Sequence, residues 1–468
     1  MMAITYLRPP LPRRPPLRLL GTGAPWLAAA AAKQPGLPSA TLSFQEPSAF
    51  RAKSLSELVR ALAVFRLCSF PLLVDHCGKL MSAARGLLGR RLFSLLLRPT
   101  VYAQFVAGEN EGEISRRVQK MSSRGLRPML AVPIEEDLGE GSGEETYDDN
   151  MEAVLECVRM SHSNAWSKEP MMQLKITALL RPELCVKLTT LIGQRPLPLN
   201  LLVRALDGEP IKIPGLNERE VAHLLCGLRR LNRVAEASVD KVRVLVDAEY
   251  TYMNPALSLV TMAMMKKFNK DGVWIWNTYQ CYLKESRSLL SEALRLSNGG
   301  GFGLGVKLVR GAYMDKERML AGKEGRPDPV HRCWEDTNDS YNGCLDAMLE
   351  AISQKPERYR LIVATHNEDS VRRAARRMQE LGMDKDGGSV CFGQLLGMCD
   401  HVSLTLAKEG YAVYKSVPYG SVEDTLPYLV RRAQENRTVL QGIRKERDLL
   451  RRELYRRLGL GGGNPSTL

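Results

Sequence analysis

The chain carries the run LIVATH at residues 361–366, the stretch NEDSVRRAARRMQELG at 367–382 and the run SVCFGQL at 389–395. The two outer runs are short and apolar, as expected of strands buried on both faces. The middle stretch has the periodicity of an amphipathic helix. A strand, a helix and a second strand in this order predict a unit of parallel sheet whose outer face is covered by the helix.

The same unit recurs along the chain from about residue 127. Eight short β-rich apolar runs are separated, for the most part, by amphipathic stretches such as 217–236. Eight repeats favour an α/β fold of the closed (β/α)8 TIM-barrel type over an open doubly wound sheet. The runs are Arg127–Pro133, Leu174–Leu179, Val242–Ala248, Val273–Gln280, Gly303–Val309, Leu361–His366, Ser389–Leu395 and Tyr411–Ser416.

Four regions are expected along the chain: a transit peptide or disordered segment at 1–45, a helical region at 46–126, the barrel at 127–440, and a basic helix and tail at 441–468. In the second region the pattern Ser54-Leu-Ser-Glu57 is typical of a capping box that opens a helix. Residues 135–149 carry eight acids among glycine and serine, which predicts a solvated loop.

Composition excludes several classes of protein. The chain has 468 residues, of which 44% are hydrophobic and 25% charged, as in an ordinary globular protein. Its net charge is +14, but acidic residues are also plentiful, with 52 in the chain. The basic residues are spread along the sequence rather than clustered on an aromatic-rich module, which argues against nucleic-acid binding. The ten cysteines form no CxxC pair and the six histidines no HxxxH or HExxH pattern, so we expect neither a disulfide framework nor a metal site.

The first 45 residues contain five basic residues and eight prolines, with no acid before Glu46. This profile is typical of a mitochondrial transit peptide, so a mitochondrial location on the matrix side is expected; the alternative is an ordinary tail. No apolar stretch of 18 residues is uninterrupted, so we expect no transmembrane helix.

A basic helix is predicted at 443–458, with Leu450, Leu454 and Leu458 at four-residue spacing. Two interpretations remain open for it. It could make peripheral contact with an anionic inner membrane, where a quinone acceptor would lie. It could equally pack against the outside of the barrel.

Polar residues close or follow many of the predicted strands. A (β/α)8 barrel carries its chemistry at the C-terminal ends of its strands, so these residues are candidates for the site. They are Lys175 in the second run, Asp247 in the third, Gln280 in the fourth, Lys307, Arg310 and Tyr313 in and beyond the fifth, and Thr365, His366 and Asn367 around the end of the sixth.

The segment YKSVPYGSVEDTLPYLVRRAQEN at 414–436 predicts a strand, a turn and a helix. On this helix Tyr428, Arg431, Arg432 and Glu435 fall at spacings of three and four, so they share a face. Two guanidiniums beside a tyrosine are suited to hold one carboxylate through paired hydrogen bonds, and Glu435 could orient one of them. The residues alone also allow a solvated face of ion pairs.

This helix resembles the signature helix of the proline dehydrogenase family, which lies over the barrel mouth and holds the substrate carboxylate. Six further segments resemble motifs of that family in order and spacing, and the match covers roughly 127–440. The resemblance implies a (β/α)8 barrel that binds FAD across its mouth. The segments are LKITAL at 174–179, DAE at 247–249, QCY at 280–282, VKLVRGAY at 306–313, ATHN at 364–367 and FGQLLGM at 392–398.

The resemblance also implies roles for individual side chains. Arg431, Arg432 and Lys175 would hold the substrate carboxylate, and Asp247 would support that lysine. The walls that press the five-membered ring against the flavin would be Tyr428, Tyr313, Ala312 and Leu395.

Flavin contacts are implied in the same way. Gln280 and Lys307 would hydrogen-bond the isoalloxazine, with Lys307 near its redox-active nitrogen, where a positive donor stabilises the reduced, anionic flavin. The other residues expected to contact or support FAD are Arg310, Gly311, Ala312, Thr365, His366, Asn367 and Glu435. The implied reaction transfers a hydride from the ring carbon beside nitrogen to flavin N5 and gives a cyclic imine.

One position departs from the proline-preferring members of the family. They carry a tyrosine twelve residues before Tyr428, where this chain has Ser416. A phenol there would collide with a 4-hydroxyl group, whereas serine leaves room and offers a hydrogen bond. The resemblance therefore implies oxidation of trans-4-hydroxy-L-proline to 1-pyrroline-3-hydroxy-5-carboxylate. The alternative is that Ser416 merely enlarges the pocket and proline is used, giving 1-pyrroline-5-carboxylate.

Two alternatives of other classes remain. A phosphate-binding barrel lyase would need a glycine-rich anion site after the last two strands, for which Gly397 and Gly420 are weak support. An inactive barrel would serve as an interaction protein. The stretch GFGLG at 301–305 mimics a dinucleotide-binding loop, but its glycines precede a predicted strand rather than follow one, so we expect a turn.

The colour of the purified protein separates a flavoenzyme from an inactive barrel. We expect a yellow protein with flavin absorption near ~450 nm. Colourless protein from a host well supplied with flavin would instead favour the interaction protein.

Overall fold

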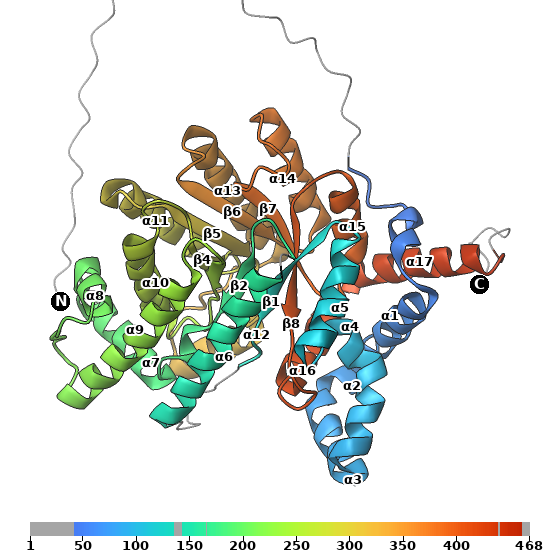
Figure 1. Cartoon of the computed structure of the whole chain (residues 1–468), viewed down its shortest axis with the longest axis horizontal. Helices are drawn as coiled ribbons and strands as arrows, with labels where there is room; N and C mark the ends of the chain where they lie inside the picture. The colour runs from blue at the N-terminus through green and yellow to red at the C-terminus, as the bar shows by residue number, and fades with distance from the viewer. Residues whose placement is uncertain (1–41, 135–142, 165, 439, 461–468) are drawn as a thin grey trace, which may run out of the picture. The chain divides into compact units, whose positions relative to one another are not determined.

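A computed structural model describes residues 42–134, 143–164, 166–438 and 440–460, with only the backbone described at 434–438 and 440–443. Eight parallel strands pair in sequence order, and β8 returns to pair with β1, which confirms the predicted closed (β/α)8 barrel (Figure 1). The strands are β1 Leu126–Ala131, β2 Met171–Leu174, β3 Arg243–Val246, β4 Ile275–Gln280, β5 Leu304–Val309, β6 Tyr359–Ala364, β7 Val390–Leu395 and β8 Val413–Pro418.

Helices surround the barrel, and their apolar faces pack on the outward side chains of the strands, as Leu224 and Leu228 do beside Val244 and Val246. Before the barrel lie η1 Pro47–Ala52, α1 Leu55–Leu67, α2 Pro71–Asp75, α3 Cys77–Leu97, η2 Arg98–Tyr102, α4 Ala103–Phe105 and α5 Glu111–Ser122. Within and after it lie α6 Glu144–Ser163, η3 Ile176–Ala178, α7 Pro182–Gln194, α8 Leu199–Leu206, α9 Glu218–Ser238, α10 Asn254–Phe268, α11 Ser286–Gly300, α12 Met314–Glu324, α13 Trp334–Gln354, α14 Glu368–Glu380, α15 Asp400–Lys408, α16 Leu426–Thr438 and α17 Leu440–Arg457.

Two expectations about local structure were wrong. The second strand is Met171–Leu174 rather than 174–179, and the chain turns into the 3-10 helix η3 directly after Lys175. The acidic stretch is helical from Glu144, where α6 begins. Acidic side chains are favourable in the first turn of a helix, and Glu144 and Asp148 also pair with Arg230 at 2.6 and 2.7 Å. Residues 135–142 of this stretch and the predicted transit peptide up to residue 41 lie outside the described residues.

The barrel interior has an apolar floor. Every second residue of a strand points inward, and at the N-terminal ends of the strands these side chains form one buried cluster around Trp276. Trp276 pairs in register with Gly305 of β5, and a Cβ at Gly305 would lie only 2.3 Å from the indole. The glycine therefore makes room for the indole, and GFGLG is part of a turn and a strand, as expected.

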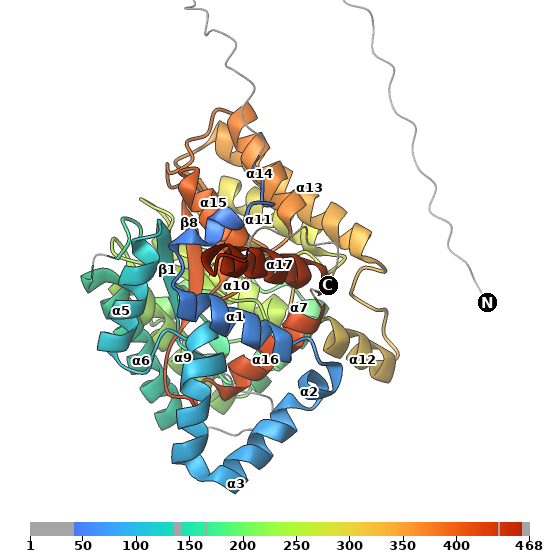
Figure 2. The same cartoon turned by 90° about the vertical axis from the view of Figure 1, so that its right-hand side faces the viewer.

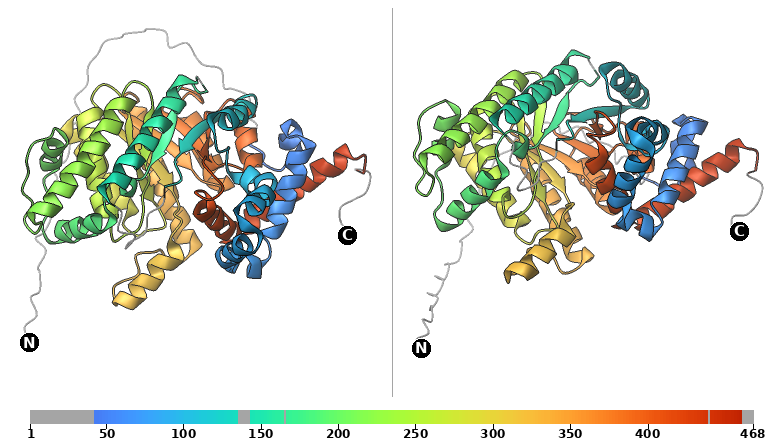
Figure 3. Two further views of the ribbon diagram at one scale, coloured as in Figure 1. Left: turned by 60° about the horizontal axis from the view of Figure 1, so that its bottom comes forward. Right: turned by 90° about the horizontal axis from the view of Figure 1, so that it is seen from below.

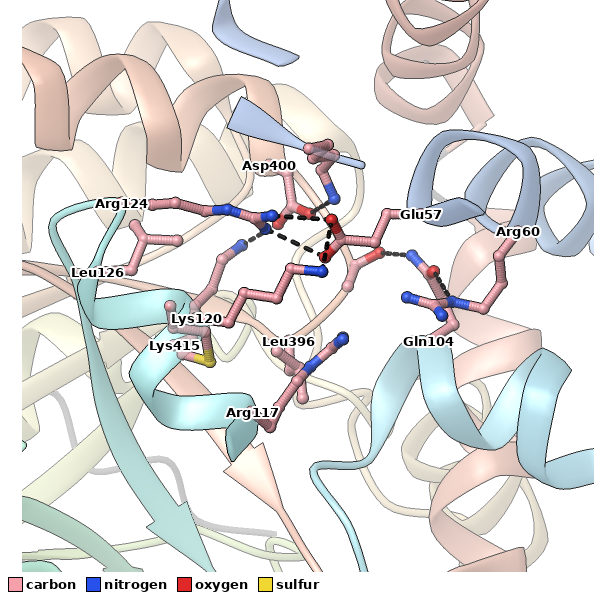
Figure 4. Close-up of a pocket in the computed structure, with 13 residues that line it drawn as sticks. Glu57, Arg60, Gln104, Arg117, Lys120, Arg124, Leu126, Leu396, Asp400 and Lys415 are labelled. Atoms are coloured by element: carbon pink, nitrogen blue, oxygen red, sulfur yellow. Dashed lines mark hydrogen bonds and ion pairs between the residues drawn. The ribbon is translucent and has the colours of Figure 1, made fainter. Parts of the chain in front are cut away.

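Buried ion pairs join the N-terminal helices to the outside of β8 (Figure 4). The capping box of α1 is present, and its Glu57 accepts Arg124 at 2.7 Å. Asp400 accepts Lys53 at 2.5 Å and Lys415 of β8 at 2.7 Å. These residues line a small cavity of about 30 Å³. They secure the N-terminal helices against the barrel.

The last helix, α17, packs against α1, η1 and α15, and its Leu449 and Leu450 are buried. The interpretation that this basic helix packs against the rest of the protein is therefore confirmed for the face that carries Leu449 and Leu450. Among the described residues, no helix is long and apolar enough to cross a membrane.

We expect Gly305→Ala to destabilise the protein by about 1–3 kcal/mol, because a buried indole must move to admit one methyl group. Thermal unfolding measures the effect. Gly299→Ala on α11 is the matched control, because its added methyl group meets no atom within 4 Å and alanine is the better helix former. Equal unfolding temperatures for the two variants would contradict the proposed role of Gly305.

Candidate active site

Polar side chains replace the apolar floor towards the C-terminal ends of the strands. Lys307 of β5 donates from Nζ to Asp247 Oδ1 at 2.7 Å, immediately beyond β3. The lysine side chain is 9% exposed and the aspartate 26%. A cation this deeply buried needs a counterion, so the pair fixes the position of both side chains.

A third side chain extends this pair across the interior. Gln173 of β2 donates from Nε2 to Asp247 Oδ1 at 3.5 Å, and its Oε1 accepts Ser416 Oγ at 2.5 Å. A carboxylate can only accept, so the amide nitrogen of Gln173 must face Asp247 and its oxygen must face Ser416. Ser416, Gln173, Asp247 and Lys307 therefore form one polar chain that spans β8, β2, β3 and β5.

Arg310, one residue beyond β5, forms the next group. Its Nη1 donates to Thr365 Oγ1 at 2.5 Å, and its Nη2 donates to Asn338 and Ser370 at 2.7 and 3.0 Å. The guanidinium lies 4.4 Å from the ring centre of Tyr341. Burial lowers the pKa of Arg310, and its Nε is buried without a hydrogen-bond partner in the described part of the chain. Arg310 has no carboxylate partner in the described part of the chain, so its charge is suited to bind an anion.

The loop after β5 also requires a glycine. Gly311 has a φ of +140°, and a Cβ there would lie 1.8 Å from the Tyr282 ring. Ala312 is exposed beside it, and the half-buried Tyr313 places its ring 4.4 Å from that of Tyr250. Gln280, at the end of β4, is buried and accepts Asn254 Nδ2 at 3.1 Å.

His366 follows β6 and is neutral. Burial, and then the positive charges of Lys415 and Arg432, lower its pKa to about 3. Its Nε2 accepts the backbone N–H of Leu395 at 3.3 Å, so the ring carries its proton on Nδ1. Asn367 caps α14 by accepting the N–H of Ser370 at 2.9 Å.

The helix α16 brings its arginine pair to the same end of the barrel. Arg432 lies with its guanidinium 4.7 Å from the Tyr428 ring centre, and both residues are buried, with 5% and 8% exposure. Tyr428 belongs to an apolar cluster that also contacts Leu395 at the end of β7. A solvated face is therefore wrong for Tyr428 and Arg432, which are both buried. Arg431 is half-buried, and the side chain of Glu435 lies outside those described.

The structure thus gathers the predicted residues into three groups. One is the polar chain with Ser416, Asp247 and Lys307; the second is Arg310 with Thr365; the third is α16 with Leu395 and His366. Lys175 is half-buried directly after β2, at the same end of the barrel.

Sequence reasoning missed Gln173, because the second strand was expected three residues too late. Its signal was a polar residue two positions before Lys175 in an apolar run, since residues i and i+2 of a strand face the same side. Asn338 was missed because it lies within α13, away from any strand end.

Fold and site together define a (β/α)8-barrel enzyme with a cationic mouth. Comparison with known proteins gives the family: a sequence model described as proline dehydrogenase matches residues 114–445. The chain is 56% identical to the hydroxyproline dehydrogenase of Xenopus laevis, over 93% of each chain. It is 32% identical to the human protein named "Proline dehydrogenase 1, mitochondrial", over 98% of each chain. The chain belongs to the proline dehydrogenase family and is an enzyme that oxidises an imino acid, so the lyase alternative is wrong.

Solved structures agree on the fold. A proline utilization A protein from Bdellovibrio bacteriovorus, inactivated by N-propargylglycine, matches with a TM-score of 0.61 and 20% identity. The match covers 85% of this chain and 39% of that one, so this chain spans about two fifths of the length of that protein. At this identity the likeness concerns the barrel alone.

We expect Asp247→Asn to destabilise the protein by about 1–3 kcal/mol, because Lys307 would keep a buried charge without its counterion. Chemical denaturation measures the change. Glu292→Gln is the control, since Glu292 pairs with Arg295 on the surface and should matter by less than about 0.5 kcal/mol. If both variants lost the same small amount, the pair would not organise the site.

Proposed function

We propose that this enzyme oxidises trans-4-hydroxy-L-proline to 1-pyrroline-3-hydroxy-5-carboxylate with FAD as its cofactor. The observation that carries the proposal is the polar chain from Ser416 through Gln173 to Asp247. It places a small hydroxyl group where proline-preferring relatives carry a phenol. Relatives named hydroxyproline dehydrogenase, at 56% identity in Xenopus laevis and 48% in human, support this substrate.

The residues present fit FAD. The cofactor carries a pyrophosphate, and Arg310 offers a buried guanidinium with an orphaned Nε and no carboxylate partner in the described part of the chain. Gly311 leaves the backbone bare beside it, with Ala312 exposed next in sequence. When bound, FAD supplies an acceptor for the hydride that leaves the ring carbon next to nitrogen. We assign its support to Gln280, Lys307, Arg310, Gly311, Ala312, Thr365, His366, Asn367 and Glu435.

The charge of Lys307 suits a position beside the isoalloxazine. Asp247 already offsets that charge, so the ammonium group of Lys307 is held in place to donate a hydrogen bond. His366 stays neutral because its pKa is about 3, and it therefore adds no charge to the site.

The substrate carboxylate is assigned to Arg431, Arg432 and Lys175. Guanidinium groups hold a carboxylate through two parallel hydrogen bonds and stay charged in a dry site. The stacking of Arg432 on Tyr428 fixes the direction of one guanidinium before the substrate arrives. We assign the walls of the ring pocket to Tyr428, Tyr313, Ala312 and Leu395.

Ser416 acts as a hydrogen-bond acceptor for the substrate 4-hydroxyl group. The only hydroxyl proton of Ser416 is donated to Gln173, whose amide is oriented by Asp247. The lone pairs of Ser416 are left to face the pocket, so the substrate hydroxyl must donate. No side chain is assigned as a general base, and the amine is proposed to bind in its neutral form or to lose its proton to solvent.

The location and the electron acceptor are part of the proposal. The basic, acid-free first 45 residues support import into mitochondria, as does the name of the human relative at 32% identity. We propose that the electrons pass to a quinone in the inner membrane. Turnover of proline to 1-pyrroline-5-carboxylate is the second candidate, favoured by that same relative.

We expect Ser416→Tyr to lower kcat/KM for hydroxyproline by about 100-fold or more while proline turnover is kept or increased, because the phenol removes both the space and the acceptor. Ser416→Ala keeps the space and loses only the hydrogen bond, so it should cost about tenfold with hydroxyproline. Steady-state kinetics with both imino acids measures these ratios. Unchanged hydroxyproline turnover in Ser416→Tyr would rule out the proposed role of Ser416.

A further inference from the structure

Exposed hydrophobic side chains are concentrated on α2 and α3. Of the 19 large hydrophobic residues that are exposed in the described part of the chain, ten lie between residues 67 and 96. Leu87 is 87% exposed, Leu72 77% and Leu95 66%. The full set in this segment is Leu67, Phe70, Leu72, Leu73, Leu80, Leu87, Leu88, Leu92, Leu95 and Leu96. Single exposed leucines are ordinary, but ten within thirty residues of one segment point to an interaction surface.

The backbone divides α3 into two short arms. Gly89 has a φ of +72° inside α3, so the helix bends there. On the second arm Leu92, Leu95 and Leu96 share one face, while Phe93 on the other face is buried against the protein. Figure 2 shows α3 at the end of the view away from α14, with α2 beside α16.

The charged side chains of α3 are all basic, whereas α2 ends in the exposed Asp75. No aspartate or glutamate occurs from residue 76 to residue 108, while Lys79, Arg90 and Arg91 are exposed on α3. Glu423 lies 3.5 Å from Arg90 and 3.6 Å from Arg85. A second copy of the same face would bring like charges together, whereas an anionic lipid surface would neutralise them.

We propose that α2 and α3 form a docking surface for an anionic phospholipid bilayer. The leucines enter the boundary between headgroups and acyl chains, and the bases contact the phosphates. The segment lies on the membrane rather than across it, since no described helix is long and apolar enough to span. On the helix α17, the other candidate for this contact, Leu450 is buried, whereas Leu458 is 53% exposed.

This surface adjoins the candidate active site. Both α2 and α3 pack against α16 (Figure 3). Cys77 Sγ of α3 lies 3.9 Å from the carbonyl oxygen of Val430. Val430 lies two residues from Tyr428 and from Arg432. Docking therefore places α16, the helix over the barrel mouth, next to the bilayer. Delivery of electrons to a membrane quinone at this place rests on the proposed function, whereas the docking itself does not.

Co-sedimentation with vesicles tests the docking surface. Purified protein is mixed with phosphatidylcholine vesicles that either contain or lack cardiolipin. We expect binding that needs cardiolipin and weakens with salt. Leu87→Glu combined with Leu95→Glu should weaken it at least tenfold, and Lys79→Gln combined with Arg91→Gln should remove most of its dependence on cardiolipin. Leu289→Glu is the matched control, because Leu289 is 54% exposed on α11 and should leave binding unchanged.

Several results would overturn the proposal. They are a wild type that does not bind either vesicle, leucine variants that bind like the control, or leucine variants that change the oligomeric state in gel filtration while vesicle binding persists. Turnover with a soluble dye acceptor is measured on the same samples. A wild type that turns over hydroxyproline but binds neither vesicle counts against the docking surface only, and a wild type that binds vesicles but does not turn over hydroxyproline counts against the proposed function only.

Discussion

Closure of eight parallel strands into a barrel is the constraint on which the rest of this molecule depends. It sends every second side chain of each strand into one shared interior, where no water can compensate an unpaired polar group. Polar side chains can therefore occupy the interior only where they form hydrogen bonds or ion pairs with one another. Trp276 fills the floor where Gly305 makes room for it. Above it, Lys307 and Asp247 offset each other's charge, and Gln173 and Ser416 complete the same network.

This arrangement gives a physical reason for the proposed substrate preference. Serine at position 416 is one member of a chain whose donors and acceptors are already assigned, so only its lone pairs remain for a further hydrogen bond. Its preference for a hydroxylated ring would then depend on residues that never touch the ring, above all Gln173 and Asp247. The carboxylate clamp proposed on α16 is separate, and there the guanidinium of Arg432 lies against the ring of Tyr428.

The sequence predicted the architecture well, because parallel strands and covering helices leave strong patterns. Seven of the eight strands overlap their expected runs closely. The exception, β2, is a four-residue strand that runs into a 3-10 helix of equally apolar residues, so hydrophobicity could not mark where it ends. That error hid Gln173. Other site contacts, such as Asn338 to Arg310, join segments far apart along the chain and leave no local pattern. The acidic composition after residue 143 predicts a loop, although acids also favour the start of a helix such as α6.

The most direct measurement of the central claim is a crystal structure of the flavin-loaded protein, reduced and held without oxygen, with trans-4-hydroxy-L-proline bound. The account predicts the 4-hydroxyl oxygen within about 2.5–3.0 Å of Ser416 Oγ, with Ser416 still donating to Gln173 and the carboxylate on Arg431 and Arg432. A 4-hydroxyl group that points away from Ser416, or a carboxylate held elsewhere, would contradict it.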